Sequence, residues 1–149
     1  MKRHESLAPL SREHHQALIL AQLLKNDAPL YKGLPDTMGE KIKYALTFYS
    51  SELIHHFKLE EKIFDLARKI NGTLEYLIVE LIDEHRILTA MFSALQEAKN
   101  KPEKMNTLGE LLTSHIRKEE RQLFPLLEQT LTADQFLEID HLLTEKTGL

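Results

Sequence analysis

Apolar residues recur along the chain at alternating steps of three and four, which is the spacing of one face of an α-helix. The clearest such face runs through Leu74, Ile78, Leu81, His85, Leu88, Phe92 and Leu95. No segment shows the period-two alternation of a half-buried strand. The pattern therefore predicts an all-α protein.

Glycine, proline and asparagine residues divide this pattern into segments. The segments predict four long helices: from about Arg12 to Asn26, from after Pro35 to about Ile70, from Thr73 to before Pro102, and from Asn106 or Thr107 to Pro125, which should end or kink the last one. Short connections between long helices favour an up-down-up-down four-helix bundle. We expect one domain over residues 1–149.

Several residues predict where individual helices begin or end. Ser11 is a plausible N-cap for the first helix, and Asp36 or Thr37 for the second. Gly72 suits the left-handed position after a helix end. Thr132 and Gln135 form a Thr-x-x-Gln capping box, which predicts a short extra C-terminal helix.

Each predicted long helix carries a histidine on its apolar face, and two helices add a glutamate one turn later. These residues are His14, His56, Glu60, His85, His115 and Glu119. Buried imidazoles and carboxylates without partners would cost more free energy than a domain of this size has to spare. Imidazole nitrogen and carboxylate oxygen together suit iron, manganese or zinc. The pattern predicts a metal site in the bundle core, and a metal-free, internally hydrogen-bonded core is the alternative.

Neighbouring residues leave some ligand assignments open. His15 competes with His14, and Glu120 competes with Glu119. The helical stripe favours His14 and Glu119, because four residues advance about 40° from His115 and five advance about 140°. Glu61 and Glu120 are expected at the surface or as hydrogen-bond partners of ligating histidines.

The ligand pattern also repeats along the chain. Arg12-Glu13-His14 corresponds to Asp83-Glu84-His85, and the segment from His56 to Glu61 corresponds to that from His115 to Glu120. The bundle is therefore interpreted as two helical hairpins, each supplying two histidines and one glutamate.

Composition excludes several classes of protein. The chain has no cysteine, which excludes disulfides and thiolate metal sites, and its net charge of −4 gives no sign of a nucleic-acid partner. No apolar run approaches the roughly 20 residues of a membrane span, and the first thirty residues show no signal-peptide pattern. We expect a cytoplasmic protein. Extra leucines such as Leu77 and Leu111 could serve a homodimer or complete the core, and the sequence does not identify a protein partner.

The motifs His56-Phe-x-x-Glu60-Glu61, Glu84-His85 and His115-Ile-x-x-Glu119-Glu120, with His14 before them and Leu-Phe-Pro after them, resemble the hemerythrin-like, or HHE, cation-binding family. The resemblance spans nearly the whole chain. It implies two iron ions bridged by carboxylates and by an oxo or hydroxo group. It also implies that the protein binds or reacts with oxygen, nitric oxide or peroxide, with roles in iron homeostasis or iron–sulfur stress repair.

The chain departs from the oxygen-carrying members of that family at one position. Those members have a second histidine one turn from the histidine of their third long helix, which corresponds to His85, whereas Leu81 and Thr89 flank His85 here. Two six-coordinate irons would then keep about two open positions, which favours reaction with a small molecule over simple oxygen carriage. An oxygen or iron sensor, or a storage module without turnover, is the alternative, so the sequence leaves open whether this is an enzyme.

Overall fold

The computed structural model describes residues 2–147, and within them every regular element is helical. The helices are α1 (Ala8–Leu24), α2 (Met38–Phe48), α3 (Ile54–Ala67), α4 (Gly72–Ala94), α5 (Lys101–Lys118), α6 (Phe124–Thr130) and α7 (Ala133–Thr147), with short helical turns η1 (Tyr49–Leu53), η2 (Leu95–Glu97) and η3 (Glu119–Leu123). The all-α prediction is confirmed for the described residues. Residues 1, 148 and 149 of the predicted domain lie outside them.

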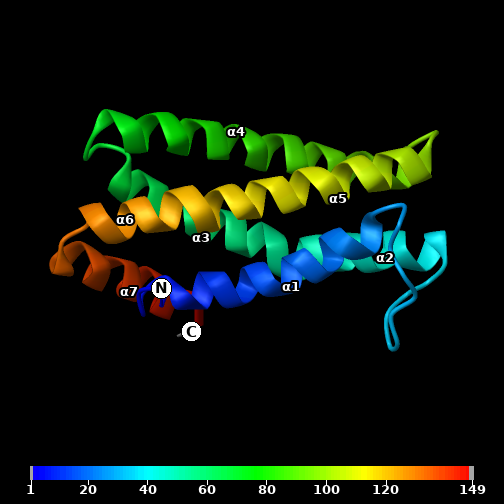
Figure 1. The fold of residues 1–149 in the computed structure, drawn as a ribbon, viewed down its shortest axis with the longest axis horizontal. Coiled ribbons are helices and arrows are strands. Elements are labelled where there is room, and N and C mark those ends of the chain that lie inside the picture. Colours follow the sequence, from blue (N-terminus) through cyan, green and yellow to red (C-terminus); the bar gives the residue numbers. More distant parts are fainter. Residues whose placement is uncertain (1, 148–149) are drawn as a thin grey trace.

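The helices form an elongated bundle (Figure 1). Two π-helical turns join shorter helices end to end, so that α2, η1 and α3 make one rod and α5, η3 and α6 make another. These rods lie along the long axis with α1 and α4, and α7 folds back at one end beside α3 and the N-terminus. None of the described helices is long and apolar enough to cross a membrane.

The first helix begins earlier than its capping pattern predicted. α1 starts at Ala8 with Pro9 in its first turn, where a missing N–H leaves no hydrogen bond unmade. Ser11, the predicted cap, therefore lies inside the helix, and its hydroxyl donates to the Glu120 carboxylate instead. The helix ends at Leu24, two residues before the predicted Asn26.

The middle boundaries also needed correction. The rod made of α2, η1 and α3 ends at Ala67 rather than at the predicted Ile70. Gly72 is not a left-handed residue after that end but the first residue of α4, which Asn71 caps by accepting the Leu74 N–H at 2.9 Å. The end of α4 at Ala94 agrees with the prediction that this helix stops before Pro102.

Proline positions explain the differences in the last rod. α5 begins at Lys101 rather than at Asn106 or Thr107, because Pro102 fits the first turn of a helix as well as it stops one. Pro125 does not end the helical path, which continues to Thr130 after the π-helical turn η3. The two predicted caps at Thr37 and Thr132 are confirmed, and the capping box joins Thr132 N to Gln135 Oε1 at 2.8 Å.

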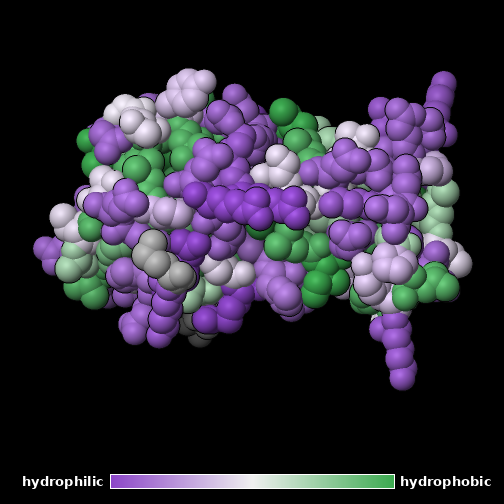
Figure 2. Space-filling model, viewed as in Figure 1, coloured by the Kyte–Doolittle hydropathy of each residue, from purple (hydrophilic) through white to green (hydrophobic). Residues whose placement is uncertain are grey.

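The core consists of two apolar clusters with the polar ligand candidates between them. One cluster includes Leu10, Leu81 and Leu123, and the other includes Ala17, Leu88 and Leu112. Along each helix the histidine therefore follows residues of one cluster and precedes residues of the other. The face of the molecule seen in Figure 2 is mostly hydrophilic, with scattered apolar patches.

Close packing of α1 against α5 helps to set the position of the site. At Gly109 a Cβ atom would lie 2.6 Å from the Ala21 carbonyl oxygen, a distance that real Cβ contacts do not reach. The glycine lets the two backbones approach, which draws the His14 and His115 helices together.

Candidate metal centre

The structure brings together all six residues singled out from the sequence. Each is at most 4% exposed: His14, His56, Glu60, His85, His115 and Glu119. They come from α1, α3, α4, α5 and η3, so that every rod of the bundle contributes. The alternating steps of three and four carry this arrangement, because they keep each residue on the inner face of its helix.

The six residues form two overlapping groups of four that could each hold a metal ion. One group holds His14 and His56, and the other holds His85 and His115. Both include Glu60 and Glu119, and within each group the potential ligand atoms lie within 4.8 Å of one another. The two shared carboxylates are therefore placed between the two histidine pairs.

Several atoms facing this space have no hydrogen-bond partner among the described residues. They are Nε2 of His56, Nε2 of His115 and both carboxylate oxygens of Glu119. His115 Nε2 lies 3.3 Å from a Glu119 oxygen, but the contact does not have hydrogen-bond geometry. Buried polar atoms are rarely left in this condition. Convergent donor atoms with no partner fit the coordination of a cation.

The outer nitrogen of each histidine contacts a carboxylate from another helix. The distances from Nδ1 are 2.6 Å for His14 with Glu120, 2.7 Å for His56 with Glu13, 2.8 Å for His85 with Glu61 and 2.7 Å for His115 with Glu84. A carboxylate only accepts, so each Nδ1 donates a proton. This leaves Nε2 of each neutral imidazole as the atom directed at the centre, which is the usual arrangement of a metal-binding histidine.

Two of these supporting carboxylates also pair with cations. Glu120 contacts Arg3 at 3.3 Å and accepts from Ser11, while Glu84 pairs with Lys118. Sequence reasoning gave Glu61 and Glu120 this supporting role as one option and missed Glu13 and Glu84. The signal was present, because Glu13 and Glu84 directly precede His14 and His85 in the repeated motif.

Charge interactions within the cluster shift the pKa of its members. Burial lowers the pKa of His56, but the Glu60 charge and the hydrogen bond to Glu13 outweigh it and raise the pKa to about 9. Burial opposes the Glu119 charge at His115 in the same way, and the net pKa is about 10. Burial would raise the pKa of Glu60, yet the surrounding histidines hold it well below its usual range. Without metal, these histidines are therefore protonated near neutral pH, and their positive charges stabilise the buried carboxylates.

The remaining histidines, Glu120 and Tyr49 lie outside the two ligand groups. His15 and His55 are exposed, and so are His4 and His141. Glu120 is directed at the outer nitrogen of His14 rather than at the shared space. Tyr49 packs on Phe92 and donates to Thr89 at 3.0 Å, so it belongs to the core.

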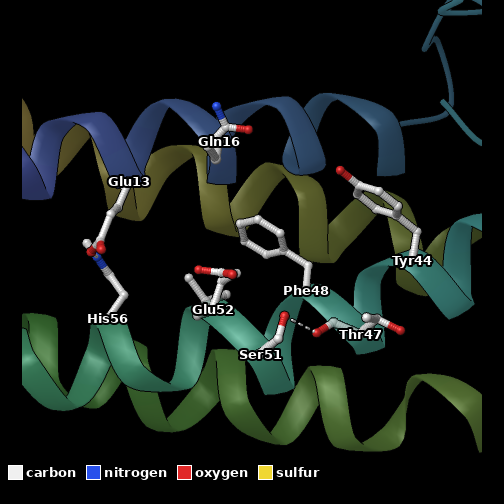
Figure 3. A pocket seen from close by; sticks show the side chains of 9 residues that line it. Glu13, Gln16, Tyr44, Thr47, Phe48, Ser51, Glu52 and His56 are labelled. Carbon is white, nitrogen blue, oxygen red and sulfur yellow. Dashed lines mark hydrogen bonds and ion pairs between the residues drawn. The ribbon is translucent and has the colours of Figure 1, made fainter. Parts of the chain in front are cut away.

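A surface pocket of about 420 Å³ adjoins the centre between α1 and the α2–α3 rod. Figure 3 shows the rings of Tyr44 and Phe48 along it and the contact between Glu13 and His56 at the end away from Tyr44. His56 thus borders both the pocket, on its Nδ1 side, and the ligand cluster, on its Nε2 side.

Comparison with known proteins agrees with this geometry. Neither the curated proteins nor the solved structures gave a match. Among protein families, the hemerythrin HHE cation binding domain matches residues 5–127, which include all six buried candidates. A match over most of the chain, together with a buried histidine and glutamate cluster able to hold a metal, gives the assignment: the chain belongs to the hemerythrin HHE cation-binding family.

Proposed function

We propose that this protein holds two iron ions in its core and binds or reacts with oxygen, nitric oxide or peroxide. The observation that carries the proposal is the pair of four-residue groups that share Glu60 and Glu119. Two cation positions joined by two carboxylates are how di-iron proteins of helical bundles are built. Imidazole and carboxylate ligands also accept zinc or manganese, so the metal is part of the proposal.

The proposed ligands divide into two sets. Nε2 of His14 and His56 would bind one ion, and Nε2 of His85 and His115 the other, with Glu60 and Glu119 contacting both. Bound iron would supply redox chemistry toward the small ligand. The residues of the chain orient the imidazoles through their Nδ1 protons, and the two apolar clusters keep bulk water from the ions.

The proposed domain extent, helix order, location and partner class follow from membership in the family. We propose one domain over residues 1–149, with α1, α2–α3, α4 and α5–α6 in up-down-up-down order and α7 as the extra helix. The course of the chain along the bundle in Figure 1 supports this order. Cytoplasmic location, and a small ligand rather than nucleic acid as the partner, belong to the same proposal.

Iron content and optical spectrum test this function directly. We expect about two irons per chain after anaerobic ferrous loading, with near-ultraviolet bands after exposure to air that disappear with dithionite. Oxygen, peroxide and nitric oxide would then be added separately, because turnover and reversible binding give different spectra over repeated cycles. Zinc alone, or no metal after ferrous loading, would contradict the proposal.

The pocket beside His56 is the proposed approach for the small ligand. Its aromatic walls suit an uncharged diatomic molecule, and the carboxylates of Glu13 and Glu52 at its lining disfavour anions. The Phe48→Trp variant should fill part of the pocket and slow nitric oxide association about tenfold, as measured by stopped-flow absorbance.

A matched variant separates blocking of the pocket from a general effect of a larger ring. Leu30→Trp adds an indole at a position that is exposed and outside the pocket lining, so its association rate should equal that of the parent. Iron content should be unchanged in both variants. An unchanged rate in Phe48→Trp would show that the ligand enters elsewhere.

A further inference from the structure

The outward face of α4 carries several exposed apolar side chains. Three of its large hydrophobic side chains are exposed: Tyr76 by 76%, Val79 by 42% and Ile87 by 50%. They repeat at helical spacing along one face, with exposed Ala90 and Ala94 continuing the row. The upper edge of the molecule in Figure 2, where α4 lies in Figure 1, shows hydrophobic residues interrupted by hydrophilic ones.

The two charges near the middle of this face are opposite in sign. Asp83 and Arg86 are both largely exposed and lie 2.9 Å apart on the same helix. They are equally far from a midpoint between residues 84 and 85. If a second α4 runs antiparallel across that midpoint, Asp83 of each copy lies opposite Arg86 of the other. The face is therefore complementary in charge to itself.

The same register matches a protruding side chain to a hollow. With a rise of 1.5 Å per residue, Tyr76 lies roughly 13 Å from the midpoint. On the other side a hollow of about 540 Å³ is lined by Ala90, Met91 and Ala94, which lie roughly 8 to 14 Å from the midpoint. Tyr76 of each copy would thus reach the hollow of the other, and Val79 would lie opposite Ala90.

We propose that the outer face of α4 is a two-fold interface between two copies of this chain. A two-fold interface requires a surface that is complementary to itself, and this face meets that condition in charge, in shape and in register. Leu77 and Leu111, the leucines considered for a homodimer in the sequence, take no part, because Leu77 is buried in one apolar cluster and the partly buried Leu111 packs against the other.

Charge reversal tests the interface and its register together. The parent should sediment as a dimer at micromolar concentration. Asp83→Arg places two arginines opposite each other, so we expect the dimer dissociation constant to rise roughly tenfold or more. Arg86→Asp should have the same effect, and the double variant Asp83→Arg with Arg86→Asp should restore the parent value. A monomeric parent, or single variants that dimerise like the parent, would overturn the proposal.

A second set of variants tests the contact between Tyr76 and the hollow. Tyr76→Ser should weaken the dimer, while Leu137→Ser, which removes another exposed hydrophobic side chain on α7, should not. Circular dichroism establishes that each variant is folded. Because the chain has no cysteine, the double variant Val79→Cys with Ala90→Cys gives a clean crosslinking test. A disulfide-linked dimer supports the register, and its absence under oxidising conditions contradicts it.

Discussion

Replacing Glu60 by glutamine is expected to lower the iron bound per chain from about two ions to less than one. The Glu60 carboxylate lies 3.1 to 3.2 Å from Nε2 of three histidines, and it belongs to both candidate metal groups. A neutral amide of the same size offers one weak oxygen ligand and no charge. Under the proposed ligand set both ions would lose a ligand at once, so the loss should affect the whole centre. Elemental analysis of protein loaded with ferrous iron measures it.

The adjacent residue provides the matched control. Glu61 contacts the outer nitrogen of His85 at 2.8 Å and does not belong to either ligand group. Glu61→Gln should keep the iron count of the parent while weakening its affinity roughly 10- to 100-fold, as measured by competition with a chelator. Full iron content in Glu60→Gln would contradict the proposed ligand set.

The burial of the six candidate ligands was predictable because it depends on helical periodicity. His85 lies between Leu81 and Leu88 at steps of four and three, and all three side chains are buried. The same reasoning placed Glu119 rather than Glu120 inside. These inferences require only the spacing of residues within one helix, which the sequence states directly.

Contacts between helices were harder to predict than burial. The pairing of Glu13 with His56, or of Glu84 with His115, depends on how two helices are rotated relative to each other. Glutamates on a partly exposed face are common, so nothing in their local sequence separates them from solvated residues. The repeated Glu-His pair was the available clue, and it becomes informative only when the neighbouring helix is known.

Helix ends were mispredicted where one residue suits two structures. Pro102 can stop a helix or occupy its first turn, and here the first turn is used. Pro125 follows the π-helical turn η3, which carries Glu119. A π-helical turn leaves no periodic pattern in the sequence from which it could be predicted. The helix start at Thr132 was predicted correctly, because two residues of the capping box, Thr132 and Gln135, both indicate the same helix start.

Removing the metal is expected to lower the melting temperature by about 15 to 30 °C at pH 7. A ligand that binds only the folded state stabilises it by about 4 kcal/mol at a thousand times its dissociation constant, so two ions contribute about 8 kcal/mol. For a chain of this size each kcal/mol shifts the melting temperature by about 2 to 4 °C. Differential scanning calorimetry with and without a chelator measures the difference, and equal melting temperatures would favour a metal-free polar core.

The pH dependence of the metal-free form provides a second readout of the same experiment. The pKa values of His56 and His115 are about 9 and about 10 in the fold, against an ordinary value of 6.5. Raised pKa values stabilise the metal-free fold fully below pH 6.5, and this contribution is lost as the pH rises through 9 to 10. The metal instead requires neutral imidazoles, so protons compete with it at low pH. The difference in melting temperature between loaded and chelated protein should therefore widen from pH 6.5 to pH 9, and a difference that stays constant would show that these histidines do not bind the metal.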